Sequence, residues 1–141
     1  MKTKVRLNEG LQFVGTGESG HSVILDGSSD AGGFDSACHP VEMVVISLGG
    51  CTGMDIASLL EKMRQNFTDL EIEMEGQRRE QHPKVLTDLI LTYRVWGEVE
   101  EEKFEKAINL SLDKYCSVAN TLKPTVSINY DYQINPEVEN G

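Results

Sequence analysis

The segment HPVEMVVISLGGCTGMD, residues 39–55, decides how this chain folds. Its residues from Met43 to Leu48 are almost wholly apolar, and a helix that is apolar on all sides is typical of a protein centre. Pro40 suits a first helical turn, and Glu42 places negative charge near the positive end of the helix dipole. We therefore predict a buried central helix, and we expect Gly49-Gly50 to kink it or to admit another backbone.

Short strands are predicted before this helix, and longer ones after it. A turn signal, Asn8-Glu9-Gly10, separates residues 3–7 from 11–15 and predicts a hairpin; residues 21–25 predict a third strand, followed by a loop at 28–33. Alternating apolar and polar residues predict further strands at 70–77, 89–96 and 126–134.

A second helix is predicted from residue 98 onward. Its inward stripe has helical spacing and consists of Phe104, Ile108, Leu112, Tyr115 and Cys116. The element order is then strands, helix, two strands, helix, strand. This order predicts one α+β domain over residues 1–141, with two long helices packed on antiparallel sheet.

Composition narrows the classes of function. Net charge is −10, from 23 acidic and 13 basic residues, which disfavours nucleic acid and anionic membranes as partners. The start of the chain lacks the apolar core of a secretory signal, so we expect a cytoplasmic protein. Three cysteines without a CxxC pair, and only three histidines, indicate free or catalytic thiols rather than a disulfide framework or a structural zinc site.

Cys51 and Cys116 are the candidate reactive residues. Cys51 follows the glycine pair and is predicted to begin a helical run, where the helix dipole favours the thiolate. The alternative is a small buried cysteine without reactivity. Cys116 taken alone is better explained by core packing. If the two thiols meet on the same sheet, they form a dithiol that can attack an oxidant and close a disulfide.

Three further residues are weaker candidates. Cys38 is best explained as an incidental cysteine. Glu42 either complements the helix dipole or orients a guanidinium or substrate near Cys51. On a continuous helix these two residues, nine positions apart, face opposite sides, so they converge only if the glycine pair breaks the helix. His39 is a possible auxiliary cation.

The quoted segment and Lys114-Tyr115-Cys116-Ser117 resemble the OsmC/Ohr family over nearly the whole chain. The resemblance implies an intertwined homodimer with two active sites at its interface and thiol-dependent reduction of organic hydroperoxides. By that resemblance Cys51 is the peroxidatic cysteine, Cys116 the resolving cysteine and Glu42 the active-site carboxylate. A dithiol reductant, such as a lipoyl protein or a small thiol, would restore the thiols, and no cofactor or metal is implied.

The sequence departs from this family at one important position. Characterised peroxidases of the family pair the carboxylate with an arginine from the N-terminal half, whereas Arg6 is the only arginine before Glu42 here. Three hypotheses follow: a cysteine-based peroxidase, a slow thiol sensor or small-ligand-binding dimer, and a structural module whose cysteines only fill the core.

Overall fold

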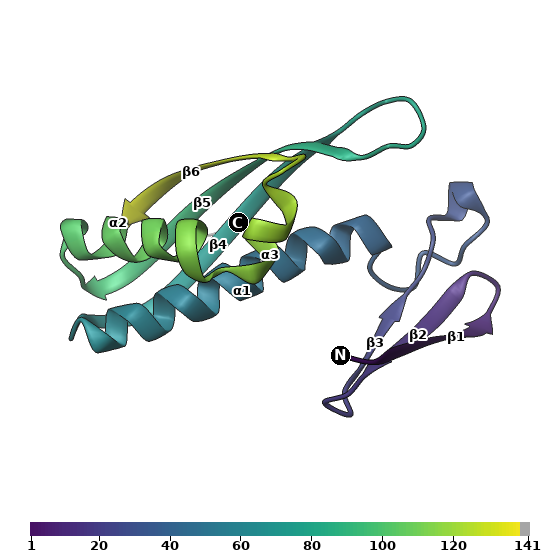
Figure 1. Ribbon diagram of the computed structural model, residues 1–141, viewed down its shortest axis with the longest axis horizontal. Helices are drawn as coiled ribbons and strands as arrows, with labels where there is room; N and C mark the ends of the chain where they lie inside the picture. Colours follow the sequence, from purple (N-terminus) through teal and green to yellow (C-terminus); the bar gives the residue numbers. More distant parts are fainter. Residues whose placement is uncertain (139–141) are drawn as a thin grey trace. The chain divides into compact units, whose positions relative to one another are not determined.

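The computed structural model describes residues 1–138, which form two compact units (Figure 1). The first unit is Met1–Val44, and the second begins at Val45. Each contains one three-stranded sheet, and the second also contains most of the helical residues. The predicted α+β class is confirmed, and each unit is described by itself below.

The first unit is an antiparallel sheet with strand order β1-β2-β3. Its strands are β1 (Thr3–Glu9), β2 (Gln12–Gly17) and β3 (Ser22–Leu25), so the predicted hairpin and third strand are confirmed. Gly10 adopts a φ of 58° in the first turn, a conformation that glycine reaches without strain. The predicted loop contains one short 3-10 helix, η1 (Ser29–Ala31).

One face of this first sheet is apolar and uncovered. Cross-strand partners point to the same face, and the pairing aligns Val5 with Gly15 and Val23, and Leu7 with Phe13 and Leu25. Four of these side chains are nevertheless exposed: Val5, Leu7, Phe13 and Val23. A sheet normally buries its apolar face against another layer, whereas this face is left exposed within the described residues 1–138.

A buried carboxylate fixes the loop after β3. Asp26 accepts hydrogen bonds from the backbone N–H groups of Gly27 (2.7 Å), Phe34 (3.2 Å) and Ser36 (3.1 Å), and one from the Ser36 hydroxyl (2.5 Å). These bonds, with the Ser36 hydroxyl first among them, hold the pKa of Asp26 below its usual value of 3.8.

The second unit contains the sheet β4-β5-β6. Its strands are β4 (Asn66–Arg78), β5 (Leu86–Glu98) and β6 (Ser127–Ile134), which confirms the three strands predicted from alternation. The β4–β5 pair is antiparallel, but β5 and β6 are parallel, so the prediction of wholly antiparallel sheet is wrong. The helical segment between β5 and β6 is a crossover connection. It returns the chain to the end of the sheet at which β5 starts, so that β6 can run parallel to β5.

The first long helix, α1 (Pro40–Lys62), runs unbroken through Gly49-Gly50. A Cβ at Gly49 would lie 2.4 Å from the Met74 sulfur, and one at Gly53 would lie 3.0 Å from Cδ1 of Ile72. The glycines therefore admit side chains of β4 rather than another backbone. The helix is not buried all round as predicted: Met54 is 75% exposed within this chain.

Length and mean hydropathy (1.7) would allow α1 to cross a membrane, and only 28% of its most apolar stretch is buried. Core helices of soluble proteins pass the same test, so this property by itself is weak support for a membrane span.

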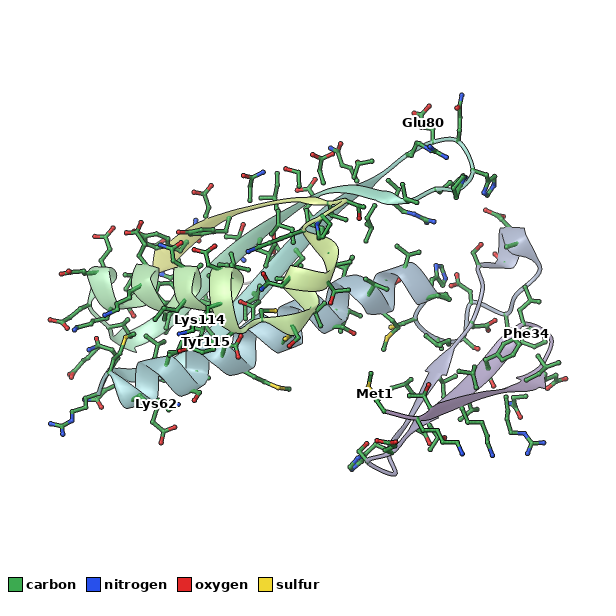
Figure 2. All side chains as sticks on the ribbon, viewed as in Figure 1. Met1, Phe34, Lys62, Glu80, Lys114 and Tyr115 are labelled. Atoms are coloured by element: carbon green, nitrogen blue, oxygen red, sulfur yellow. The ribbon has the colours of Figure 1, made fainter. Side chains whose placement is uncertain are left out.

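The second predicted helix is divided into three pieces. These are α2 (Glu101–Leu110), one π-helical turn η2 (Ser111–Tyr115) and α3 (Ser117–Leu122), so only one long helix is present in the described residues 1–138. The Cys116 N–H bonds the Ser111 carbonyl at 2.7 Å, five residues back. This wider turn moves Tyr115 out of the predicted inward stripe. Its side chain is 48% exposed and carries the Lys114 ammonium over its ring (Figure 2).

The helices of the second unit lie along one side of its sheet (Figure 1). The core between them is made of fully or nearly buried apolar side chains: Leu48, Ile56, Leu60, Leu89, Leu91, Tyr93, Val95, Phe104, Ala107, Ile108, Leu112, Cys116, Ala119 and Val126. Alternation along β5 places Arg94 on the opposite face of the sheet, where it pairs with Glu71 and Glu73.

Replacing Leu91 by Ala should destabilise the second unit by about 2–5 kcal/mol, because it removes a fully buried side chain and leaves a cavity. Urea unfolding followed by circular dichroism measures this change. Ile90→Ala on the other face of the same strand is the matched control, since Ile90 is 50% exposed and its loss should cost less than about 0.5 kcal/mol. Equal costs at the two positions would contradict the assigned strand faces.

Asp26→Asn should lower the melting temperature at neutral pH, since the amide accepts the loop hydrogen bonds less strongly. The pKa of Asp26 is depressed on folding, so its stabilisation is complete above the ordinary value of 3.8 and is lost as pH falls through the lower folded-state pKa. The difference between wild type and variant should therefore shrink below pH 3.8 in thermal scans. Asp30→Asn, at an exposed position nearby, should change little at any pH.

Candidate functional site

Cys51 lies in the middle of α1, eleven residues after its first residue, Pro40. The prediction that Cys51 begins a helix and gains from the dipole there is wrong, because the glycine pair does not interrupt the helix. The thiol is half-buried and packs at the edge of the core of the second unit.

Cys116 is held at the junction of η2 and α3. It is the N-cap of α3, and its sulfur accepts a hydrogen bond from the Ala119 N–H at 3.3 Å. The residue is fully buried, as predicted. Burial raises the pKa of Cys116 to about 11, and the neighbouring Cys51 and Asp55 act in the same direction.

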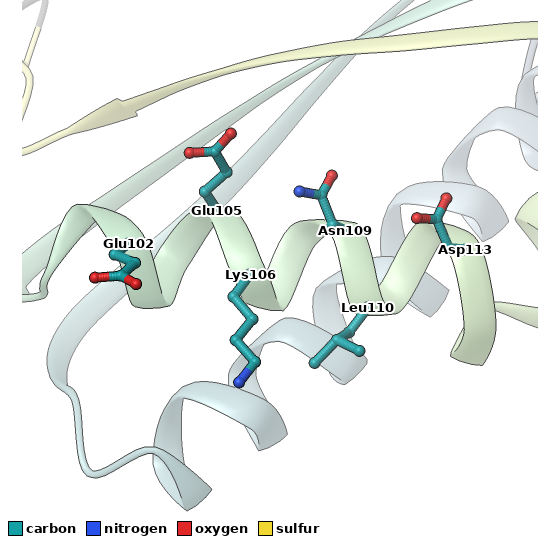
Figure 3. Close-up of a pocket in the computed structure, with 6 residues that line it drawn as sticks. All are labelled: Glu102, Glu105, Lys106, Asn109, Leu110 and Asp113. Atoms are coloured by element: carbon teal, nitrogen blue, oxygen red, sulfur yellow. The ribbon is translucent and has the colours of Figure 1, made fainter.

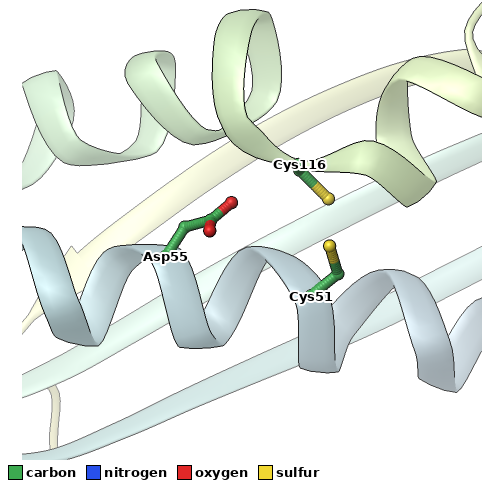
Figure 4. A group of neighbouring side chains, drawn as sticks. All are labelled: Cys51, Asp55 and Cys116. Carbon is green, nitrogen blue, oxygen red and sulfur yellow. The ribbon is translucent and has the colours of Figure 1, made fainter.

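The tertiary structure brings the two thiols together with a carboxylate. The sulfurs of Cys51 and Cys116 and one carboxylate oxygen of Asp55 all lie within 4.8 Å of one another. Figure 4 shows the two thiols pointing toward each other from α1 and the η2–α3 junction, with Asp55 beside them. We call Cys51, Asp55 and Cys116 the thiol cluster.

Asp55 was not predicted from the sequence to be a site residue. A signal was present, since residues four apart on a helix share a face and Asp55 follows Cys51 by four. Its importance depends on Cys116, which is 61 positions further along the chain.

A buried chain of hydroxyl groups holds Asp55 in place. The Ser111 hydroxyl donates to Oδ2 of Asp55 at 2.9 Å and lies 2.8 Å from Oγ1 of Thr52, which lies 3.0 Å from the Tyr93 hydroxyl. Because the Ser111 proton is used on Asp55, Thr52 donates to Ser111 and Tyr93 donates to Thr52. Burial raises the pKa of Tyr93, which keeps it a donor. We call Tyr93, Thr52 and Ser111 the hydroxyl chain.

The remaining predicted site residues lie in the first unit. The Cys38 thiol hydrogen-bonds the Glu42 carboxylate, and that bond is the main reason why the pKa of Cys38 is raised. The His39 ring lies 3.0 Å from the Asp35 carboxylate. Since α1 is continuous, the condition under which Glu42 and Cys51 of one chain would converge is not met.

The arginines of the second unit do not supply the expected cation. Arg94 is on the opposite face of the sheet, and Arg78 and Arg79 donate to the backbone carbonyls of Lys84 and Gln81. Arg64 follows Cys51 by 13 positions, which is about 20 Å along a helix axis. No ion pair to Asp55 is found among residues 1–138.

The surface hollow on α2 is separate from the thiols. It measures about 400 Å³ and is lined by Glu102, Glu105, Lys106, Asn109, Leu110 and Asp113 (Figure 3). Three carboxylates and no thiol line it, so it offers nothing to the chemistry of the thiol cluster.

Comparison with known proteins agrees with the fold and the motifs. The family described as OsmC-like protein matches residues 33–131. Protein YhfA of Escherichia coli K12 is 38% identical over 135 residues, which cover 95% of this chain and 98% of YhfA. The crystal structure of a hypothetical protein from Aquifex aeolicus VF5 is 30% identical with a TM-score of 0.85, and 97% of each chain is covered.

A more distant structure shares the fold alone. It is an organic hydroperoxide resistance protein OsmC from Legionella pneumophila, 14% identical with a TM-score of 0.71, with 94% of this chain and 97% of that chain covered. The matched segment, the full-length identity to YhfA and the common fold lead to one conclusion: this chain belongs to the OsmC-like protein family.

Proposed function

We propose that this protein is a thiol-dependent peroxidase that reduces organic hydroperoxides through Cys51 and Cys116. The observation that carries the proposal is the approach of the two sulfurs to within 4.8 Å inside one unit. A disulfide requires an S–S distance of about 2.05 Å, so the two sulfurs must move closer together before the bond forms. The name of the Legionella structure, a hydroperoxide resistance protein, supports the choice of substrate class.

Burial assigns different tasks to the two thiols. Cys51 is partly exposed and can meet a peroxide, whereas Cys116 is fully buried and reaches only groups inside the core. The thiolate is the nucleophile toward an oxidant, and access decides which thiol is oxidised first. Cys51 is therefore the peroxidatic residue of the proposal and Cys116 the resolving one.

The reaction proceeds in three balanced steps. The Cys51 thiolate attacks the terminal oxygen of the hydroperoxide, the O–O bond breaks, and the alkoxide takes up a proton and leaves as an alcohol. The Cys116 sulfur then displaces the hydroxyl of the Cys51 sulfenic acid, which leaves as water as the disulfide forms. A dithiol such as a lipoyl protein, or small thiols, reduces the disulfide by exchange. This cycle suits a reducing compartment such as the cytoplasm.

Two features of the second unit bear on rate. Asp55 lies beside both sulfurs and opposes thiolate formation at Cys116, and among the described residues of this unit no arginine pairs with Asp55. A slow peroxidase or thiol sensor is therefore the second candidate. A cation contributed from outside this unit would raise the rate, and Arg6 and His39 of the first unit are two candidates.

We also propose a homodimer. The uncovered apolar face of the first sheet needs a covering layer, and the exposed Ile46 and Met54 of α1 present another apolar surface. Both surfaces belong to every copy, so a second copy of the chain would bury them in a closed, two-fold interface.

Reduced wild-type protein should consume cumene hydroperoxide faster than hydrogen peroxide, because the surroundings of Cys51 are apolar. Cys51→Ser should fall to the rate without protein, and Cys116→Ser should stop at the sulfenic acid. Stopped-flow kinetics with a chelator present and mass spectrometry of the Cys51–Cys116 disulfide measure these outcomes. Cys38→Ser is the control and should behave like wild type.

Wild-type protein that stays reduced with both peroxides would exclude the enzyme and leave the slow-sensor function. Oxidation that persists in Cys51→Ser would place the reactive thiol elsewhere.

Light scattering coupled to size exclusion should give twice the chain mass of 15.7 kDa. Leu7→Asp places a charge on the apolar face of the first sheet and should shift the protein toward the monomer. Lys4→Asp, on the opposite face of the same strand, is the matched control and should leave the mass unchanged. A wild-type monomer at micromolar concentration would exclude the homodimer.

A further inference from the structure

The donor set of the thiol cluster is unusual for a site that only forms a disulfide. Cys51 and Asp55 are four residues apart on one face of α1, and Cys116 comes from the η2–α3 junction. One sulfur, a second sulfur and a carboxylate oxygen therefore converge from two separate elements, within 4.8 Å of one another (Figure 4).

These separations are close to those of a zinc site. Zn–S bonds of about 2.3 Å and Zn–O bonds of about 2.1 Å in a tetrahedron place the donor atoms about 3.6–3.8 Å apart. The three donors thus need to move inward by roughly 1 Å or less each to hold one ion. Three protein ligands leave a fourth position open, as in catalytic rather than structural zinc sites.

The hydroxyl chain gives the carboxylate the support that metal ligands usually have. Ser111 donates to Asp55 at 2.9 Å, Thr52 is hydrogen-bonded to Ser111, and Tyr93 is hydrogen-bonded to Thr52. The three hydroxyl-bearing residues are fully buried. Groups of this kind orient a ligating carboxylate, and their loss typically costs 10–100-fold in metal affinity.

Charge also favours a cation at this position. Asp55 is half-buried, and it forms no ion pair among residues 1–138. The lysines nearest to Cys116 along the chain are engaged elsewhere: Lys114 lies over the Tyr115 ring, and Lys123 contacts the Leu112 carbonyl and Asp113. Two thiolates and one carboxylate are all ligands that Zn²⁺ accepts in proteins, and the thiolates favour zinc over Mg²⁺ or Ca²⁺.

We propose that Cys51, Asp55 and Cys116 bind one Zn²⁺ per chain, and that the bound ion keeps the dithiol reduced. On binding, the two S–H bonds break and their protons go to solvent, two Zn–S bonds and one Zn–O bond form, and no electrons are transferred. Disulfide formation uses the same two sulfurs, so metal binding and oxidation exclude each other. Oxidation by a hydroperoxide would release the ion.

Zinc binding is measured on reduced, chelator-treated full-length protein, by competition with a chromophoric chelator and without peroxide. Wild type should bind one equivalent. Ser111→Ala should weaken binding about 10–100-fold and Asp55→Asn at least about tenfold. Cys38→Ser, which keeps the cluster intact, should bind like wild type. Circular dichroism confirms that each variant is folded.

Replacing zinc by Co²⁺ gives a second, spectroscopic readout, and its wild-type signal does not depend on how any variant folds. Thiolate-to-cobalt charge-transfer and tetrahedral d–d bands should appear in wild type and be lost in Cys51→Ser and Cys116→Ser. Absence of stoichiometric binding, or wild-type affinity in Asp55→Asn, would overturn the proposal.

One added equivalent of Zn²⁺ should slow disulfide formation by cumene hydroperoxide. Failure of the peroxidase proposal is seen separately, as a lack of peroxide consumption in chelator. The metal proposal fails if the competition assay detects no binding, or if zinc leaves oxidation of a working peroxidase unchanged.

Discussion

The second unit depends on the close approach of α1 to the β4–β5 pair. Gly49 and Gly53 leave room for Met74 and Ile72 of β4, and on the next face Thr52 reaches the Tyr93 hydroxyl of β5. Residues Leu48, Ile56 and Leu60 bury their side chains along the same contact. Since a Cβ at Gly49 would overlap the Met74 side chain, the small residues set the distance at which the helix lies, and that distance brings Cys51 to Cys116.

The thiol cluster is a polar group built into an apolar core. An unpartnered buried hydroxyl costs free energy, so the hydroxyl chain is satisfied by ending on a carboxylate. That carboxylate in turn opposes ionisation of the buried Cys116 thiol, in the same direction as the burial of that residue. Peroxide reduction requires a cation or a proton donor to overcome this effect. A bound zinc ion would supply the positive charge directly. The two proposals therefore address the same electrostatic property of the site.

In the first unit, by contrast, apolar side chains are exposed on one face of the sheet. Its sheet carries Val5, Leu7, Phe13 and Val23 on one exposed face, while its polar interactions gather around Asp26 and around Cys38 with Glu42. A three-stranded sheet gains stability mainly from the face that it buries. Association with a second copy would supply that burial, and it would also bring new charged groups to surfaces that one chain leaves open.

Local pattern in the sequence determined most of the elements: the alternation at 70–77, 89–96 and 126–134, the first hairpin and the long apolar helix all follow from nearest-neighbour spacing. The family resemblance also followed from short motifs. Three features required the tertiary structure. The parallel β5–β6 pair depends on how a crossover returns the chain, and the π turn that exposes Tyr115 depends on packing around Ser111. The meeting of Cys51, Asp55 and Cys116 joins residues more than 60 positions apart, and only the packing of two separate helical segments on one sheet decides such a distance.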